Sequence, residues 1–203
     1  MNRVVSILID KMIDGNIINS KEKKIYFYGL TIFFSFTTNI VAFLMAAKIL
    51  GLFINCLFFL MAFIPLRLFA GGYHANTKIY CYTLSIITYS VFFILLKSPL
   101  VNLSIMILIT SILSLLIIAK NCPIIHKNRL ISNYEFKRYK LISWAIILID
   151  FFFLLIIFWL NLSDSLIFSF SFGIIIESLS ILMTKFNQCT SLFDISQINR
   201  GEK

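Results

Sequence analysis

The sequence predicts an all-α fold: a polytopic helical membrane protein with about six membrane-embedded helices and an N-terminal amphipathic helix. Of its 203 residues, 60% are hydrophobic, and the mean hydropathy is +0.94. Only 13% are charged, against about 25% in a typical soluble domain, which leaves too little polar surface to cover a water-soluble globule. Uncharged apolar stretches recur at close to the roughly 20 residues that are needed to cross the hydrocarbon of a bilayer.

The first element, residues 1–24, is expected to lie on the membrane surface. It lacks the long apolar core and the A-x-A-like site of a cleavable signal peptide. Its apolar side chains recur near helical spacing, opposite three charged ones; the apolar residues are Val4, Val5, Ile7, Leu8, Met12 and Ile13, and the charged ones are Asp10, Lys11 and Asp14. This pattern is typical of an interfacial amphipathic helix.

Six apolar stretches follow and are predicted as membrane spans, at about 29–47, 49–66, 79–96, 100–119, 141–160 and 166–183. If the N-terminus is cytoplasmic, sixteen of the 18 Lys and Arg residues fall on the cytoplasmic side, and only Lys48 and Lys97 fall outside. Basic residues concentrate on the cytoplasmic side of membrane proteins, so this orientation is favoured over its inverse. We therefore expect a multi-pass protein of the cell membrane with both termini in the cytoplasm.

A single integral membrane domain is expected over residues 1–203, because the sequence shows no internal repeat, low-complexity tract or second domain. Its cytoplasmic parts would be a polar stretch at 67–81, a basic loop at 120–140 and a tail at 184–203. The net charge of +9 does not indicate nucleic-acid binding. The basic residues lie beside apolar spans, where they set topology and contact anionic lipids of the bilayer.

The polar stretch, RLFAGGYHANTKIYC at 67–81, carries the candidate catalytic pair His74 and Cys81. A thiolate can attack a carbonyl carbon, and a histidine can activate the thiol and later protonate the leaving amine. The spacing alone is a weak indication, since an ordinary cytoplasmic loop could contain both residues by chance.

The seven-residue spacing sets a geometric condition on this pair. On one straight helix the two residues would lie about 10 Å apart, whereas proton transfer needs about 3 Å. Gly71 and Gly72 permit backbone conformations that are closed to other residues. Asn76 or Thr77 can cap a helix that carries Cys81.

Under this arrangement Cys81 would lie in the first helical turn, where unpaired N–H groups and the helix dipole lower the pKa of a thiol. Arg67 or Lys78 could add to this effect or hold a carboxylate of the substrate. His74 would lie on a non-helical segment that folds back over the helix. Non-helical backbone is tolerated at membrane depth where it lines a cavity within the protein.

The polar stretch resembles the signature of the accessory gene regulator B (AgrB-like) family, membrane cysteine endopeptidases of Gram-positive quorum sensing. That signature joins an arginine, a Gly-Gly or Gly-Ala pair, a histidine, and a cysteine seven residues later. Two more segments are similar: KIYFYGL at 24–30 resembles the family's entry segment, and CPIIHKNRLISNYEFKRYK at 122–140 resembles its second cytoplasmic loop. Length, span count and topology also fit, so the resemblance covers nearly the whole chain.

The resemblance implies a peptidase of the bacterial cell membrane without a cofactor or metal, in which Cys81 is the nucleophile and His74 the general base and acid. The family's substrate is a small pro-peptide with an amphipathic N-terminal helix, a signal segment and an acidic C-terminal tail. Loss of the tail leaves the signal as an acyl-thioester, which an internal Cys or Ser closes into a thiolactone or lactone. Lys127 and Arg129 of the basic loop would fit the acidic tail. A homodimer is compatible with the family.

Other interpretations of individual residues stay open at this stage. Cys122 and His126 share the predicted cytoplasmic side with the candidate pair, and two Cys with two His can hold zinc, although the basic surroundings disfavour a cation. Asp150 and Glu177 fall inside predicted spans, where ionisable residues are costly and often functional. Asp150 could orient the imidazole as a third catalytic member, but its predicted depth argues against contact.

Two other classes of function also stay open. A transporter of a small solute or peptide would suit the intramembrane carboxylates, although such proteins commonly contain internal repeats and this sequence shows none. A non-catalytic membrane chaperone would bind the pro-peptide through the amphipathic N-terminus and the basic loop without cleaving it.

Overall fold

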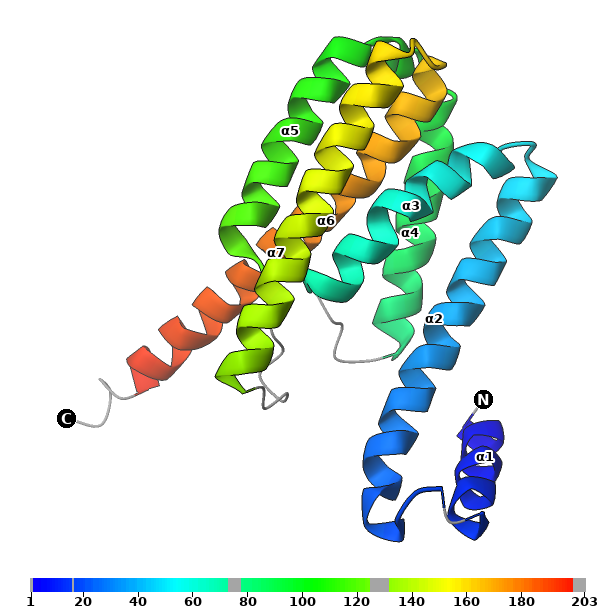
Figure 1. Ribbon diagram of the computed structural model, residues 1–203, viewed down its shortest axis with the longest axis vertical. Helices are drawn as coiled ribbons and strands as arrows, with labels where there is room; N and C mark the ends of the chain where they lie inside the picture. The colour runs from blue at the N-terminus through cyan, green and yellow to red at the C-terminus, as the bar shows by residue number, and fades with distance from the viewer. Residues whose placement is uncertain (1, 16, 73–77, 125–131, 199–203) are drawn as a thin grey trace. The chain divides into compact units, whose positions relative to one another are not determined.

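The computed structural model describes residues 2–15, 17–72, 78–124 and 132–198, and places seven α-helices and no strand in these ranges (Figure 1). The helices are α1 Asn2–Asp14, α2 Lys23–Ile49, α3 Phe53–Phe69, α4 Lys78–Leu96, α5 Ser104–Asn121, α6 Asn133–Trp159 and α7 Asp164–Ile198. Two short 3-10 helices are η1 Ser20–Glu22 and η2 Pro99–Asn102. The predicted all-α fold is confirmed. The chain divides into two compact units, Met1–Gly51 and Leu52–Lys203.

In the N-terminal unit, α1 packs against α2. Val5 and Ile9 of α1 are fully buried in a small apolar cluster that includes Phe27 of α2. An exposed ion pair, with Lys23 Nζ 2.7 Å from Asp10 Oδ1, adds a second contact between the two segments. Other apolar side chains of α1 are exposed, which suits contact with a bilayer surface; they are Val4, Ile7 and Leu8.

The central helix of the second unit is α7, which contacts α3, α4, α5 and α6 (Figure 1). Of an 18-residue apolar window within Asp164–Phe186, 61% is buried, whereas the corresponding windows of the other three helices that are long enough to cross a membrane are 17–28% buried. Small residues let neighbouring backbones approach α7 closely; those that are buried are Ser169, Ser171, Gly173 and Ser178. The helix continues to Ile198, through most of the segment predicted as a tail at 184–203.

Contacts between α3 and α7 follow the same order along both helices, so the two run parallel. Near their start, Asn55 Nδ2 donates hydrogen bonds to Ser165 O at 3.0 Å and Ser169 Oγ at 3.1 Å. Farther along, a Cβ on Gly173 would lie 2.7 Å from the carbonyl oxygen of Phe59, so the close approach requires glycine. Aromatic rings bring α4 into the same core; they are Phe59, Phe92, Phe168 and Phe172.

Helix α5 also runs parallel to α7. Ser104 donates a hydrogen bond to the Asp164 carboxylate where both helices begin, and Lys185 Nζ donates one to Asn121 Oδ1 at 2.7 Å where α5 ends. α3, α5 and α7 therefore point the same way, as the second, fourth and sixth of six alternating spans would. We use "polar end" for the end of this bundle that carries Arg67, Asn121 and Lys185.

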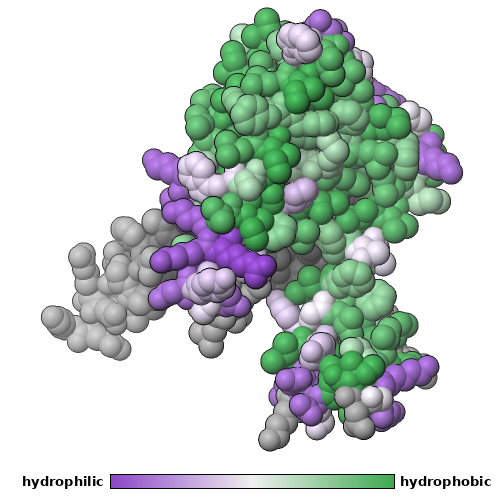
Figure 2. Space-filling model, viewed as in Figure 1, coloured by the Kyte–Doolittle hydropathy of each residue, from purple (hydrophilic) through white to green (hydrophobic). Residues whose placement is uncertain are grey.

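Length and surface composition of the helices identify a membrane protein. Among the described residues, four helices are long and apolar enough to cross a membrane, namely α2, α5, α6 and α7. α3 and the segment Tyr82–Leu96 of α4 are shorter apolar helical stretches. Figure 2 shows a mainly hydrophobic flank on the body formed by α3–α7, with hydrophilic residues gathered toward the polar end. Together with the N-terminal α1, this arrangement matches the predicted set of apolar helices.

The helix that contains the fifth predicted span, 141–160, begins before that span. The loop was assigned to 120–140, but α6 begins at Asn133. Ser132 Oγ accepts a hydrogen bond from Glu135 N–H, and Glu135 Oε2 accepts one from Ser132 N–H at 2.9 Å. This capping box satisfies two donors that a helix start otherwise leaves unpaired. The basic residues that the helix takes from the predicted loop are Lys137, Arg138 and Lys140.

Candidate functional site

The polar stretch predicted at 67–81 covers the end of α3 and the start of α4. Arg67 lies in the last turn of α3, and Gly71 and Gly72 follow with φ of 86° and 151°. These conformations suit glycine, which lacks the Cβ that restricts other residues. Because α4 begins at Lys78, Cys81 belongs to its first turn.

Several predicted site residues lie outside the described residues. They are His74 and Asn76, within 73–77, and Lys127 and Arg129, within 125–131. The side chains of Lys78 and Cys81 also lie outside, although the backbone of both residues belongs to α4. The catalytic roles of His74 and Cys81 and the supporting roles of the others therefore stay predictions.

The segment that follows α5 meets the segment that follows α3. Ile124 N–H donates a hydrogen bond to Ala70 O at 2.9 Å. A Cβ on Gly71 would collide with the carbonyl oxygen of Ile124 and would lie 3.1 Å from its carbonyl carbon. The two polar segments that are far apart in the sequence thus join at the polar end, at a contact where only glycine fits.

Arg67 pairs with a buried carboxylate of α7. Its Nη1 atom lies 3.6 Å from Glu177 Oε2 and donates a hydrogen bond to Ser180 Oγ at 2.5 Å. The side chain of Glu177 is 0% exposed, and that of Arg67 is 20% exposed. Among the described residues, neither carboxyl oxygen of Glu177 has a hydrogen-bond partner. Burying a charge is costly unless another charge compensates it, and Arg67 supplies a compensating charge here.

Gly72 lies directly on this group of side chains. A Cβ on Gly72 would collide with Arg67 Nη1 and would lie 2.7 Å from Ser180 Oγ and 2.9 Å from Glu177 Oε1. The backbone of Gly72 is therefore held at van der Waals distance from all three side chains. The candidate base, His74, is only two residues farther along the chain, so this contact lies close to it in the sequence.

The pairing of Arg67 with Glu177 was missed by reasoning from the sequence. Arg67 was expected beside the Cys81 thiol or a substrate carboxylate, and Glu177 had no assigned role. One signal was present: Glu177 is the only acidic residue between 165 and 186, and an ionisable residue inside a span commonly faces a partner within the bundle. No local pattern could identify that partner, because it comes from a different helix.

The comparison with known proteins shows the family of the chain. The family model for Accessory gene regulator B matches residues 2–181. The chain belongs to this family. Members of the AgrB family process the precursor of an autoinducing peptide in quorum sensing, and the chain takes that role from its membership. No curated protein and no solved structure matches the chain.

Other ionisable groups of this AgrB-family protein were considered as part of a site. Cys56 and Cys122 are buried and free. Burial raises the pKa of the Cys122 thiol, an effect that its backbone hydrogen bond, Lys140 and Ser143 partly offset. Among the described residues, no group of three or more His, Cys, Asp or Glu could hold a metal ion, and the zinc alternative depends on His74 and His126, which lie outside them.

Asp150 lies deeper in the bundle than the polar end. Its side chain is buried on α6, and its Oδ2 atom has no hydrogen-bond partner among the described residues. Ser143, seven residues earlier on α6, lies beside Cys122 at the end of α5. At 1.5 Å per residue, Asp150 is about 10 Å farther from that end. This depth argues against a contact between Asp150 and the candidate imidazole.

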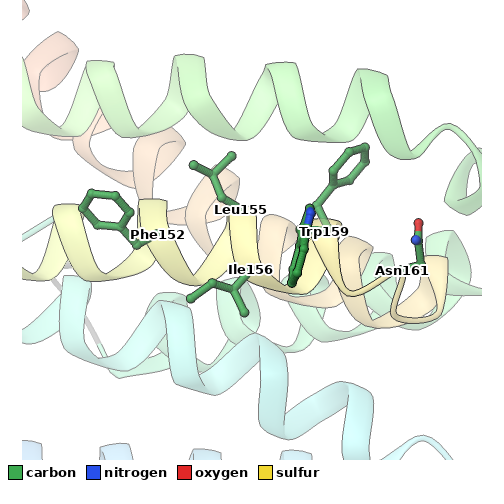
Figure 3. A pocket seen from close by; sticks show the side chains of 6 residues that line it. Phe152, Leu155, Ile156, Trp159 and Asn161 are labelled. Atoms are coloured by element: carbon green, nitrogen blue, oxygen red, sulfur yellow. The ribbon is translucent and has the colours of Figure 1, made fainter.

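An open apolar groove lies toward the opposite end of α6 (Figure 3). Its lining consists of Phe152, Leu155, Ile156, Phe158, Trp159 and Asn161. Figure 3 shows these side chains along α6, with Asn161 in the turn that follows it, and no acid, base or nucleophile is among them. Such an apolar surface suits contact with lipid.

Proposed function

We propose that this AgrB-family protein is a membrane-embedded cysteine endopeptidase that removes the C-terminal tail of a small autoinducer pro-peptide. The observation that carries the proposal is the place of Cys81 in the first turn of α4, directly after the segment that leaves Gly72. A helix N-terminus favours a thiolate, because its unpaired N–H groups and dipole stabilise negative charge. His74 lies between these two fixed points in the sequence.

In the first step, His74 takes the proton of the Cys81 thiol, and the thiolate attacks the carbonyl carbon that precedes the tail. The C–N bond breaks, and His74 returns the proton to the leaving amine. The tail departs with a new amino terminus. The signal segment stays on Cys81 as an acyl-thioester.

In the second step, an internal Cys or Ser of the signal segment attacks the thioester carbonyl and gives its proton to His74. The bond to Cys81 breaks, the thiol recovers its proton, and the peptide closes into a thiolactone or lactone. Holding the internal nucleophile near the thioester raises its effective concentration far above that of competing groups. Exclusion of water from the polar end would favour this closure over hydrolysis.

Capture of the pro-peptide would use charge and the bilayer together. Its amphipathic N-terminus would lie on the membrane, and its acidic tail would meet Lys127, Arg129 and the basic first turns of α6. Complementary charge of this kind favours capture and orientation more than raw affinity. In this proposal the polar end faces the cytoplasm, as the distribution of Lys and Arg favours, and two copies of the chain could act side by side.

The test is mass spectrometry of a candidate pro-peptide after incubation with the purified protein in liposomes. Wild type, Cys81→Ala and His74→Ala are compared, with Cys122→Ala as the matched cysteine control. We expect wild type and Cys122→Ala to release the tail and to form a cyclic product, and the other two variants to do neither. Cleavage by Cys81→Ala would refute the nucleophile assignment.

The same protein variants distinguish the peptidase from the chaperone, the transporter and the zinc site. Peptide binding without cleavage by wild type would favour the chaperone, while solute counterflow in proteoliposomes that does not depend on Cys81 would favour the transporter. Loss of cleavage in Cys122→Ala, together with inhibition by a chelator, would favour the zinc site.

A further inference from the structure

Three side chains at the polar end, Arg67, Glu177 and Ser180, form what we call the anchor group. We propose that the anchor group fixes the backbone at Gly72 and thereby positions the chain that leads to His74. The inference rests on the proposed function, because it assigns positioning residues for that reaction. None of the three is proposed to touch the reacting atoms.

The contacts around Gly72 support a fixed position for the backbone. On one side, a side chain at Gly72 would overlap the anchor group; on the other, Gly71 lies against Ile124, whose N–H is bonded to Ala70. The two glycines are therefore enclosed by α3, α7 and the segment after α5. Five residues, 73–77, separate this enclosed point from the start of α4 at Lys78, and Cys81 is three residues farther along.

The helices that carry the anchor group are themselves held in register. Asn55 bonds to α7 near one end of α3, and Gly173 brings the two backbones together in the middle. Arg67 and Glu177 then meet at 3.6 Å near the other end. A displacement of Gly72 toward α7 would therefore require movement of the Arg67 side chain away from a buried carboxylate, which is costly in an apolar surrounding.

This geometry changes the role expected for Arg67. A guanidinium that recognises the acidic tail of a substrate would need to present its donors to the incoming peptide. Here Nη1 of Arg67 is directed at Ser180 and Glu177 instead. Recognition of the tail then falls to Lys127, Arg129 and other basic residues of the second polar segment.

The experiment is a double-mutant cycle on tail removal, with kcat and KM measured separately. The variants are Arg67→Gln, Glu177→Gln and the double variant, and Asp150→Asn is the matched control for neutralising a buried carboxylate in the same unit. We expect each single variant to lower kcat at least tenfold with KM changed less than threefold. We expect the double variant to be no slower than the slower single one, since both changes remove the same interaction. Asp150→Asn should stay within threefold of wild type.

Two further sets of variants distinguish a loss of positioning from a general folding defect. Glu177→Asp retains the carboxylate and should recover part of the lost kcat. Gly72→Ala places a methyl group against the anchor group, whereas Gly51→Ala places one at another glycine of positive φ, 71°, where nothing lies within 4 Å. We expect Gly72→Ala to lower kcat at least tenfold and Gly51→Ala to leave it within threefold. All variants are compared at equal amounts of folded protein by size-exclusion chromatography.

Each result bears on the inference. Additive losses in the cycle, or a rise in KM with kcat unchanged in Arg67→Gln, would overturn it and would make Arg67 a receptor for the tail. An equal effect of Gly51→Ala and Gly72→Ala would also overturn it. Cleavage that survives Cys81→Ala would instead refute the proposed function, so the two failures are distinguishable.

Discussion

Around Phe59, α3 packs on α7 through aromatic rings and a glycine, whereas around Arg67 it packs on the same helix through an ion pair. In the first region Gly173 and four phenylalanines fill the interface. In the second region, one to two turns farther along α7, Glu177 and Ser180 face the guanidinium. One pair of parallel helices thus contains two kinds of contact.

The two regions differ in what they contribute. Close packing of apolar groups contributes directly to stability through dispersion contacts. A buried ion pair contributes little, because desolvation of both charges offsets their attraction, and hydrophobic residues of similar volume often do as well or better. The Phe59 region therefore holds α3 and α7 together. In the Arg67 region, the side chains of the two helices contact the backbone at Gly72, where the segment after α3 begins.

The largest effect on stability is expected from breaking the ion pair on one side only. Arg67→Gln leaves the Glu177 carboxylate without its cation and should cost about 3–5 kcal/mol of unfolding free energy. Adding Glu177→Gln should recover most of that loss while cleavage stays low. Equilibrium unfolding in mixed micelles measures this difference. A double variant as unstable as Arg67→Gln would contradict the assignment of the cost to an unpaired charge.

A smaller loss is expected in the apolar region. Gly173→Ala pushes α3 from α7 and should cost about 1–3 kcal/mol, as overpacking does in other cores. Gly29→Ala is the control, since nothing lies within 4 Å of that position. Equal free energies of unfolding for the two variants would show that the close approach of Gly173 to Phe59 does not exclude a larger side chain there.

A still smaller loss is expected from the polar contact at the start of the helix pair. Asn55→Ala removes two hydrogen bonds between α3 and α7 and should cost about 0.6 kcal/mol, with an upper value of about 1.7. Asn39→Ala is matched to it, because Asn39 Nδ2 bonds to Ser35 O of its own helix. The same unfolding assay should rank Asn55→Ala below Asn39→Ala in stability; the reverse order would contradict the interhelical role.

The smallest effect concerns a cysteine outside the proposed chemistry. Burial raises the pKa of Cys122, so at neutral pH less of this thiol is ionised and its alkylation by iodoacetamide should be slow. The rate should rise as the pH is raised, because ionisation increases toward the elevated pKa. Mass spectrometry of labelled peptides, compared with Cys81, measures both rates. Faster labelling of Cys122 than of Cys81 at pH 7 would contradict the separation between an inert and a reactive thiol.

Much of the fold could be predicted from the sequence, because apolar length, charge distribution and the amphipathic N-terminus are local properties. The positions of α1 to α7 and the place of Cys81 in a first helical turn follow from such patterns. The prediction gave only the membrane span at about 141–160, and α6 begins before it, at Asn133, where the Ser132–Glu135 capping box lies. The contact of Gly71 with Ile124 and the pairing of Arg67 with Glu177 depend on which helices become neighbours. Periodicity within one helix does not contain that information.

The most direct test is the intact mass of the protein during a single turnover with the pro-peptide. Rapid acid quenching should trap an adduct that equals the pro-peptide without its tail, and digestion should locate it on the fragment that contains Cys81. Glu177→Gln should accumulate this adduct at least tenfold more slowly, and Asp150→Asn at close to the wild-type rate. Tail release without any adduct on Cys81, or with an adduct on another residue, would contradict the proposed chemistry at the polar end.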